Sequence, residues 1–544
     1  MKSLYSITTA VRRAAWNAMT RVDGWVNRLY GSRYNPLYHS GAIVIGLLLV
    51  LVATGLYLLL FYRVGAPWAS VARITDQAWL GRWIRGVHRF ASDAAVVAAA
   101  VHAFRMYAQH RSWGPRALAW VSGLALLAVI FVCGWTGYVL VWDVQAQLLA
   151  AEGARILDVL PIFSEPLGRT FVGERPLPSA FFFLNLFAHI ALPIGVGLLV
   201  WIHVSRLARP VLLPPRRVLW GVVAALVALA IVWPVGMAPV ADPLRIPERV
   251  PLDAFFAFWL PLTRRLPVGA VWALGGALAL VAVLAPWWTR PQREARPGKA
   301  EVDARRCTGC EQCVHDCPYD AITMVEREPG DPRPGLVALV NPDLCVSCGI
   351  CIGSCAPMAV GLPGWTGREE LAVAREFLGR EPRAAGQVVV VGCEWSAATV
   401  ESALGGAPLI PVPCTGHVHT SMIEHLLRGG AGGVLVAACP EWDCRGREGG
   451  KWLVQRMYHG READLKPRVD RRRVRVVEAS AGEPAVLRAA LEEFAASVAA
   501  LADGDADGDG RTAADGGAAA DGDLDAPDGD ARGDVSLELE GVAS

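Results

Sequence analysis

Long apolar stretches, separated by short polar connections, fill the first half of this chain. Six of them are each about as long as a helix needs to cross the hydrocarbon core of a bilayer. They cover roughly residues 41–62, 87–108, 117–140, 180–205, 217–238 and 267–288. After about residue 300 the pattern changes to shorter apolar runs between turn residues. The sequence therefore predicts an all-α transmembrane bundle of six helices, followed by domains outside the membrane.

Basic residues gather on one side of the predicted spans. They lie in the N-terminal segment 1–35, between the second and third spans, after the fourth and after the sixth: Arg12, Arg13, Arg21, Arg28, Arg33, Arg105, Arg111, Arg116, Arg206, Arg209, Arg216, Arg217, Arg290, Arg293, Arg296 and Lys299. Arginine and lysine near the ends of spans favour the cytoplasm. We therefore expect a multi-pass protein of the inner (cytoplasmic) membrane, without a cleavable signal peptide, whose N-terminus and later domains are cytoplasmic.

Four histidines interrupt the apolar stretches as two pairs with the same spacing. His88 and His102 are fourteen positions apart, and so are His189 and His203. Fourteen helical residues make about four turns and rise by roughly 21 Å, so both members of a pair share one helix face. Two adjacent helices would place His88 opposite His189 and His102 opposite His203. Any one of them could be a satisfied membrane histidine, but the duplicated spacing favours two haems, each held between two imidazoles.

Glycines repeat with the same period in the two neighbouring spans. Gly41 and Gly55 are fourteen apart in the first span, and Gly123 and Gly137 are fourteen apart in the third. Glycine lacks a Cβ atom, so the backbone there can approach a flat macrocycle closely. Glycine is also common in membrane helices as a packing residue, so one pair alone would be weak support. The shared period predicts that these helices leave gaps for the two haems.

These residues resemble those of cytochrome b in cytochrome bc-type complexes. The resemblance covers about residues 30–290, which include the predicted membrane domain 36–290. It is carried by Arg85-Gly-Val-His88-Arg, His102-Ala-Phe-Arg105, Gly134-Trp-Thr-Gly-Tyr-Val-Leu-Val-Trp-Asp143, and His189 with His203. It implies one haem b between His88 and His189 on the outer side and another between His102 and His203 on the inner side. It also implies that Arg85 and Arg105 lie near the haem propionates.

The same resemblance implies quinone as a substrate. Relatives of this family carry a Pro-Glu-Trp-Tyr motif between the fifth and sixth spans, whereas this chain keeps Pro247-Glu248 and lacks the aromatic pair. Glu248 is the candidate catalytic residue, because a carboxylate at that position could accept a quinol proton. A loop glutamate paired with Arg245 or Arg249 explains Glu248 equally well.

Twelve of the thirteen cysteines lie between residues 307 and 444, and eight of them form two runs of one kind. The runs are Cys307, Cys310, Cys313 and Cys317, then Cys345, Cys348, Cys351 and Cys355. Clustered cytoplasmic thiols indicate metal ligands, and this spacing is typical of a bacterial-type ferredoxin with two [4Fe–4S] clusters, in which the fourth cysteine of each run binds the other cluster. We therefore expect an α+β domain at 300–362, with one cluster on Cys307, Cys310, Cys313 and Cys355 and the other on Cys345, Cys348, Cys351 and Cys317. Structural zinc is the weaker alternative.

Residues 386–500 alternate buried strand patterns with helical ones, which predicts a small α/β domain with a parallel sheet. Cys393, Cys414 and Cys439 follow three predicted strands, at the sheet edge where such folds place ligands, and Cys444 follows five residues later. The four could hold a metal centre or be buried structural cysteines. His417 and His419 lie nearby, and we expect them to face solvent.

This segment resembles the delta subunit of methyl-viologen-reducing hydrogenase. The matching elements are Gly392-Cys393, Pro413-Cys414-Thr-Gly416 and Val434-Leu-Val-Ala-Ala-Cys439-Pro-Glu-Trp-Asp-Cys444. The resemblance implies a [2Fe–2S] cluster and electron exchange with a heterodisulfide-reductase-like flavin or iron–sulfur protein. Many relatives have a further cysteine just after Cys393, where Ser396 stands nearby in this chain.

The last stretch, 503–544, is rich in Asp, Gly and Ala and cannot bury a core, so we expect it to be disordered. The net charge of +1 gives no overall attraction to nucleic acid, and none is expected as a partner.

Our leading hypothesis is a quinone-linked oxidoreductase subunit of a respiratory complex, joining the quinone pool to a cytoplasmic redox enzyme. In it the ferredoxin relays electrons at the cytoplasmic face, and the last domain exchanges them with a soluble partner. The alternative is the cytochrome b component of a quinol-oxidising bc-type complex, with separate Rieske and cytochrome c partners. A weaker third is an anchor with purely structural haems. A homodimer or larger complex is expected.

Overall fold

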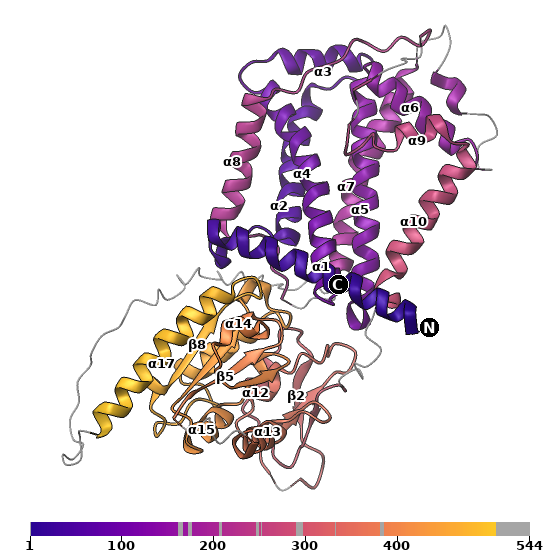
Figure 1. Ribbon diagram of the computed structural model, residues 1–544. Coiled ribbons are helices and arrows are strands. Elements are labelled where there is room, and N and C mark those ends of the chain that lie inside the picture. The colour runs from indigo at the N-terminus through magenta and orange to yellow at the C-terminus, as the bar shows by residue number, and fades with distance from the viewer. Residues whose placement is uncertain are drawn as a thin grey trace. The chain divides into compact units, whose positions relative to one another are not determined.

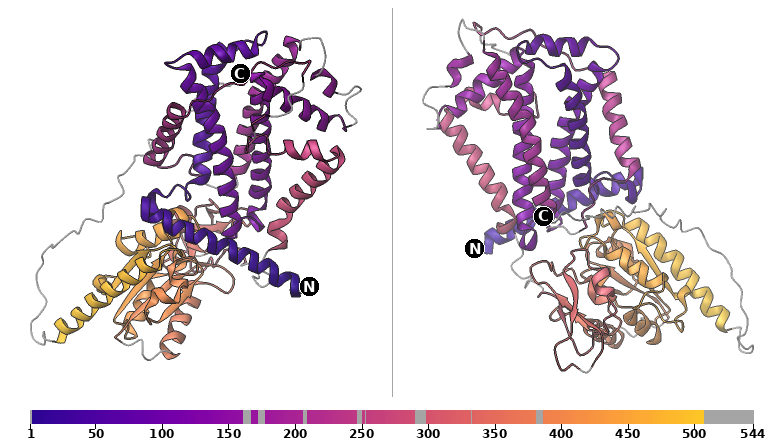
Figure 2. Two further views of the ribbon diagram at one scale, coloured as in Figure 1. Left: turned by 45° about the horizontal axis from the view of Figure 1, so that its top comes forward. Right: turned by 180° about the vertical axis from the view of Figure 1, so that it is seen from behind.

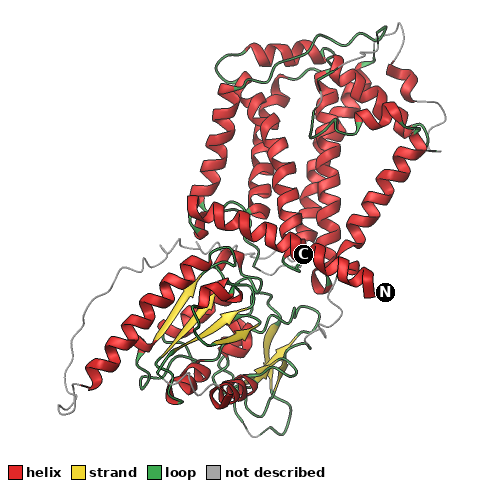
Figure 3. Cartoon of the chain, viewed as in Figure 1, coloured by secondary structure: helices red, strands yellow, loops and turns green. Residues whose placement is uncertain are grey.

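The structure is a computed structural model that describes residues 2–160, 167–171, 177–205, 209–245, 250–251, 253–289, 298–331, 333–380 and 386–506. The candidate Glu248 and most of the acidic tail lie outside these residues. The chain divides into a large unit, Met1–Val498, and a short one, Ala499–Ser544. Figure 1 shows long helices in the first half of the chain, and Figure 3 shows the strands confined to the second half.

Six long helices correspond to the six predicted spans. They are α2 (Ser40–Phe61), α4 (Gly81–Ala108), α5 (Ala117–Val141), α7 (Ser179–Ser205), α8 (Arg216–Val232) and α10 (Val268–Trp288). Helix α2 packs against α4, α5 packs against α7, and α4 also contacts α5 and α8. Figure 2 shows α2, α4, α5 and α7 running side by side. Outward-facing residues such as Leu60, 80% exposed, and Ile194, 74% exposed, give the helices an apolar surface suited to lipid.

Four of these helices, α2, α5, α7 and α10, are long and apolar enough to cross a membrane. Helix α4 falls short because it carries charged residues, among them Arg85, Arg89, Asp93 and Arg105, and α8 because it has 17 residues. Membrane-spanning length and composition are therefore confirmed for four of the six predicted spans. For α4 and α8 the helices are present, and their crossing of the membrane stays a prediction.

Among the described residues, four further α-helices belong to the membrane half, residues 1–290. They are α1 (Lys2–Tyr30), α3 (Pro67–Asp76), α6 (Val144–Leu157) and α9 (Leu260–Arg265). The start of α6 is capped by Asp143, whose side chain accepts a hydrogen bond of 2.9 Å from the backbone N–H of Ala146. Helix α1 occupies most of the N-terminal segment 1–35, for which the sequence had predicted only a cytoplasmic location.

The ferredoxin region is built from two small antiparallel sheets and two short helices. Strand β1 (Glu301–Val302) pairs with β4 (Val360–Gly361), and β2 (Ile322–Glu326) pairs with β3 (Leu336–Val340). Helices α11 (Gln312–His315) and α12 (Ile350–Ser354) each begin inside one of the two cysteine runs. The predicted α+β ferredoxin-like fold is confirmed.

The last domain has a four-stranded parallel sheet with the order β6-β5-β7-β8. The strands are β5 (Val388–Cys393), β6 (Leu409–Val412), β7 (Gly433–Ala438) and β8 (Val474–Glu478), and the helices are α13 (Gly367–Arg380), α14 (Glu401–Leu404), α15 (Thr420–Arg428), α16 (Gly449–Tyr458) and α17 (Pro484–Ala506). Alternate residues of β5 enter two cores: Val389 and Val391 pack with Met422 of α15, whereas Val388 and Val390 pack with Leu491 of α17. The predicted parallel sheet is therefore confirmed.

Candidate redox sites

The four membrane histidines come together in the two predicted pairs. The ring centres of His88 and His189 are 6.4 Å apart, and those of His102 and His203 are also 6.4 Å apart. Two imidazoles that bind one metal ion from opposite sides, each at about 2 Å, have ring centres roughly 6 Å apart. Each pair therefore has the spacing that an iron atom held between two histidines requires, and the donor set fits haem b.

Each of the four periodic glycines faces one of these histidines. A Cβ atom built on Gly41 would lie 2.8 Å from Cε1 of His102, and one on Gly137 would lie 3.0 Å from Cε1 of His189. The equivalent distances are 3.3 Å from Gly55 to His88 and 3.1 Å from Gly123 to His203. The glycines thus make room for the imidazoles themselves, which extends the expectation that they make room for a macrocycle.

Hydroxyl residues orient the imidazoles, and our reading of the sequence missed them. The Oγ1 atoms of Thr54 and Thr136 lie 2.9 and 3.1 Å from Nδ1 of His88 and His189, and Oγ of Ser122 lies 3.1 Å from Nδ1 of His203. A hydrogen bond at Nδ1 fixes the ring and leaves Nε2 for a metal. Each hydroxyl residue directly precedes a periodic glycine, and Ser40 precedes Gly41. The repeat of a serine or threonine directly before each periodic glycine is visible in the sequence and could have revealed these residues.

Replacing Gly137 with valine is expected to reduce occupancy of the outer haem site and to leave the inner site filled. Even the first side-chain carbon would lie 3.0 Å from the His189 ring, and the helix backbone cannot retreat without disturbing the packing of α5 on α7. The ratio of haem to protein and the low-spin haem signals in electron paramagnetic resonance (EPR) measure this. Gly221→Val in α8 is the control, because no atom lies within 4 Å of a Cβ built there. Equal haem contents in the two variants would contradict the assigned role of Gly137.

The two arginines expected near haem propionates have protein partners in the structure. Arg85 donates to the backbone carbonyls of Val235, at 2.7 Å, and Gly236, at 3.1 Å. Arg105 is 3% exposed and donates to the carboxylates of Asp23 and Asp443. Both arginines remain beside the histidines of α4, and their predicted role toward propionates stays a prediction.

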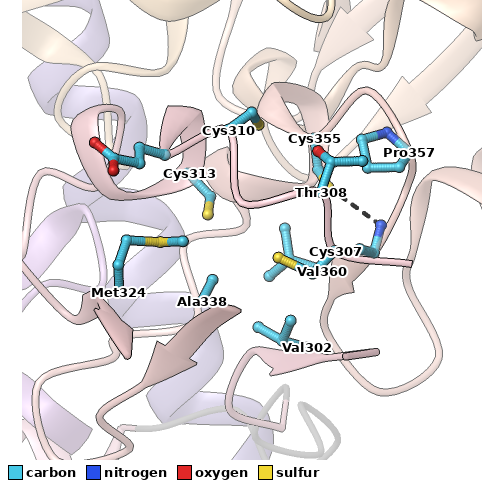
Figure 4. Close-up of a pocket in the computed structure, with 12 residues that line it drawn as sticks. Val302, Cys307, Thr308, Cys310, Cys313, Met324, Ala338, Cys355, Pro357 and Val360 are labelled. Atoms are coloured by element: carbon cyan, nitrogen blue, oxygen red, sulfur yellow. Dashed lines mark hydrogen bonds between the residues drawn. The ribbon is translucent and has the colours of Figure 1, made fainter. Parts of the chain in front are cut away.

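The eight ferredoxin cysteines line two separate pockets in the predicted, crossed arrangement. One pocket, with about 320 Å³ of unfilled space including open solvent, is lined by Cys307, Cys310, Cys313 and Cys355, as Figure 4 shows. The other, with about 350 Å³, is lined by Cys317, Cys345, Cys348 and Cys351. Four thiols around a larger volume suit a cluster better than a single zinc ion.

Burial makes these thiols poor acids on their own. It raises the pKa of Cys313 to about 12, helped by the neighbouring cysteines, and that of Cys348 to about 12. A thiolate in such a place needs a compensating positive charge, which iron ions supply. The chemistry of the pockets therefore fits iron–sulfur clusters.

The four cysteines of the last domain also come together. Cys393, Cys414, Cys439 and Cys444 form one buried cluster at the C-terminal ends of β5, β6 and β7. Cys444 lies within hydrogen-bonding reach of Cys414 and Cys439, and Cys439 within reach of Cys393. A Cβ on Gly449 would lie 2.6 Å from Sγ of Cys414, so a glycine keeps this space open. Four converging thiols fit a metal cluster, and its type stays a prediction.

Neither Ser396 nor the nearby histidines add a ligand to this group in the structure. The Ser396 hydroxyl donates to the carbonyl oxygen of Cys393 at 2.8 Å. His417 and His419 are 4% and 3% exposed, so the expectation that they face solvent was wrong. Their Nε2 atoms lie within hydrogen-bond distance of the carbonyl oxygens of Cys348 and Cys355, because the ferredoxin region packs over them. Burial lowers the pKa of each imidazole to about 4, so both are neutral near pH 7.

A polar cluster next to His88 was not anticipated from the sequence. Arg89, the next residue, donates to Asp93 and Asp253 and, at 2.8 Å, to the hydroxyl of Tyr138. That hydroxyl donates to Asp253 at 2.5 Å. Burial raises the pKa of Asp253, but hydrogen bonds from Tyr138 and from the backbone of Phe256, with the charge of Arg89, outweigh it and hold the pKa below its usual value. Asp253 is therefore ionised near pH 7.

Comparison with known families assigns the three regions in chain order. Residues 26–210 match the family "Cytochrome b/b6/petB", residues 297–359 match the "4Fe-4S dicluster domain", and residues 388–502 match "Methyl-viologen-reducing hydrogenase, delta subunit". A solved chain titled "Hyperthermophilic respiratory Complex III" is 16% identical, with a TM-score of 0.38, over 46% of this chain and 75% of that one.

The three family matches confirm the resemblances seen in the sequence. The chain combines a cytochrome b region with a 4Fe–4S region and a hydrogenase-delta-like region, and it is a membrane electron-transfer subunit. Cytochrome b implies haem b, and the dicluster domain implies iron–sulfur clusters.

Proposed function

We propose that the chain links the quinone pool, through two b haems and iron–sulfur clusters, to a cytoplasmic redox enzyme, as a quinone-linked oxidoreductase subunit of a respiratory complex. The observation that carries this proposal is the presence in one chain of two histidine pairs with ring centres 6.4 Å apart and three groups of four cysteines. One chain holding all these sites keeps them at a high effective concentration for one another.

The residues would hold the cofactors as follows. His88 with His189 and His102 with His203 would bind two b haems, the eight ferredoxin cysteines two [4Fe–4S] clusters, and Cys393, Cys414, Cys439 and Cys444 a [2Fe–2S] cluster. These groups supply one-electron chemistry when bound. The glycines make room for the imidazoles, and Thr54, Thr136 and Ser122 hold Nδ1 of three of them, which leaves Nε2 free to bind a metal.

Two carboxylates are candidates for accepting a quinol proton. Glu248 follows the proline that the cytochrome b resemblance marks. Asp253 already accepts a hydrogen bond from Tyr138, and Arg89, which follows His88, pairs with it. A general base must lie within hydrogen-bond reach of the proton that it takes, and the Tyr138 hydroxyl offers such a path to Asp253. We favour Asp253 for this reason.

We propose that the protein lies in the inner membrane with its N-terminus and iron–sulfur domains in the cytoplasm. The basic residues at α1, after α4 and at the start of α8 support this orientation. The soluble partner would be a heterodisulfide-reductase-like or other flavin or iron–sulfur protein, since the hydrogenase-delta-like region supports membership of a larger redox complex. A homodimer or larger assembly is part of the proposal.

The second candidate function is the cytochrome b component of a quinol-oxidising bc-type complex, which the cytochrome b match favours. A separate Rieske protein and a cytochrome c would then complete the reaction. Co-purification of a Rieske protein with this chain in stoichiometric amount would support it.

Adding a reduced menaquinone or ubiquinone analogue to the purified, haem-loaded protein is expected to reduce the b haems rapidly, as followed by their absorbance. Asp253→Asn is expected to slow this step by at least about tenfold, because an amide cannot take the proton that a general base takes. Glu248→Gln tests the other carboxylate in the same assay.

Asp242→Asn serves as the matched control, since Asp242 lies in the same connection and its side chain accepts from the backbone N–H of Leu244. The quinone proposal fails if quinol leaves the haems oxidised while dithionite reduces them fully. Wild-type rates in Asp253→Asn would remove Asp253 from the proposal.

A further inference from the structure

The inner end of helix α4 carries a buried ion network that joins three distant parts of the chain. Arg105 lies one helical turn after His102, and its guanidinium donates to Asp23 of α1 and, at 2.6 Å, to Asp443 of the last domain. The three side chains are only 4%, 2% and 7% exposed. The amide of Gln109, one turn further along α4, donates to the same Asp443 oxygen. A buried arginine that donates to two carboxylates at once is held in one geometry, because moving it away would leave both carboxylates buried without their partner.

This network reaches the cysteine site of the last domain directly. Asp443 is the residue before Cys444, and Arg111, just beyond the end of α4, donates to the backbone carbonyl of Cys444. Trp442, on the other side of Asp443, packs against His39, with ring centres 4.8 Å apart. The segment that delivers Cys444 is thus fixed to the helix that delivers His102, through side chains one turn from that histidine.

The same cysteine site also borders the ferredoxin region. Ile350 stands between Cys348 and Cys351, and its Cγ1 would lie 3.1 Å from a Cβ on Gly416 of the last domain. A Cβ on Gly446 would lie 3.5 Å from Sγ of Cys414 and 3.9 Å from Cδ1 of Ile350. The second ferredoxin pocket therefore borders the last-domain cysteines.

The ferredoxin region also touches the membrane half. Arg116, before α5, donates to the hydroxyl of Tyr319, which lines the second ferredoxin pocket, and to the backbone carbonyl of Arg445 in the last domain. Arg209, after α7, pairs with Asp320 at 2.7 Å, and these side chains are 32% and 55% exposed. Exposed ion pairs of this kind fix geometry weakly. The contact to the membrane half that is built from buried charges runs through Asp443 and Arg105, one helical turn from His102.

We propose that the four-cysteine site of the last domain is the iron–sulfur site adjacent to the inner histidine pair, with Arg105 and Asp443 as the positioning residues between them. The spatial order is then His102 with His203, the last-domain cysteines, the second ferredoxin pocket and finally the first. This order differs from the order in the chain, where the ferredoxin region comes before the last domain. The inference rests on the proposed function, because it takes the sites to hold haem and clusters.

Magnetic relaxation tests the order in the full-length protein without an activity assay. Ferric low-spin haem is paramagnetic and speeds the relaxation of a nearby reduced cluster, whereas ferrous low-spin haem is diamagnetic. Two samples are compared. In one, irradiation at cryogenic temperature reduces the clusters while the haems stay ferric. In the other, dithionite reduces the clusters and makes the haems ferrous. The microwave power saturation of each cluster's EPR signal is recorded in both samples. The signal of the last-domain cluster is identified as the one that disappears in Cys439→Ser.

We expect the half-saturation power of the last-domain signal to be several-fold higher with ferric haem than with ferrous haem. This difference should be the largest among the cluster signals. His102→Leu should abolish it and His88→Leu should leave it unchanged. Should His102→Leu fail to assemble, His203→Leu asks the same question, and the wild-type comparison stands without any variant. In preparations that retain both haem signals, Arg105→Leu should reduce the enhancement, and Arg105→Lys should restore part of it.

The inference is overturned if a ferredoxin cluster shows the largest haem-dependent enhancement, or if His88→Leu removes the effect. Absence of b-type haem spectra or of cluster signals from the purified protein would instead defeat the proposed function, so the two failures are distinguishable. A full enhancement in Arg105→Leu would remove the positioning role of Arg105.

Discussion

Replacing His102 with leucine is expected to leave one b haem in the purified protein in place of two. The inner iron would be held between His102 and His203, whose ring centres are 6.4 Å apart, and leucine has no nitrogen to offer. The outer pair is separate, with its own glycines and threonines, so it should stay occupied. The haem-to-protein ratio and the low-spin EPR signals measure the loss.

His39→Leu is the control for this variant. His39 is also buried, and its Nε2 is satisfied by the backbone carbonyl of Arg33, so its loss should leave both haems in place. Two haems per chain in His102→Leu would show that the inner pair is not a ligand pair. Loss of both haems would mean that the two sites do not fill independently.

Replacing Cys355 with alanine is expected to damage the cluster of the first cysteine run, although Cys355 belongs to the second run. Cys355 lines the same pocket as Cys307, Cys310 and Cys313. Iron and sulfide contents should fall by about one [4Fe–4S] cluster, because a missing thiolate leaves one iron without its protein ligand. The EPR signal that disappears should be the one lost in Cys310→Ala.

Cys133→Ala is the matched control, because Cys133 lies in α5 and lines neither pocket. It should change neither the iron content nor the cluster signals. If Cys355→Ala instead removes the signal that is lost in Cys348→Ala, each run would bind its own cluster and the crossed assignment would be wrong.

The features that the sequence could predict are those encoded by short, repeated spacing. The fourteen-residue period of His88 and His102 is a property of one helix, and the cysteine runs are loops of fixed length. The alternation of strand and helix patterns after residue 386 predicted a parallel sheet, and the carboxyl ends of its strands bring Cys393, Cys414 and Cys439 to one edge. The hydroxyl residues before the glycines follow the same period and could have been found in the same way.

The features that escaped prediction depend on contacts between distant segments. The partners of Arg105 are 82 and 338 residues away, so nothing near Arg105 reveals them. His417 and His419 are buried by residues of the ferredoxin region, which the local polar pattern around them does not show. Asp253 contacts Arg89 across 164 residues, whereas the family motif drew attention to Glu248.

The division of ligands between helix pairs has a consequence for how the membrane half assembles. Helices α2 and α4 form one packed pair, and α5 and α7 form another. Each haem would take one histidine from α4 and one from α7, so the two haems would link the α2–α4 helix pair to the α5–α7 helix pair. Ligand binding of this kind contributes directly to folding free energy. Under haem starvation the newly made chain would lack both links between the helix pairs. Its abundance in the membrane should therefore follow the cell's haem supply as much as the rate of its synthesis.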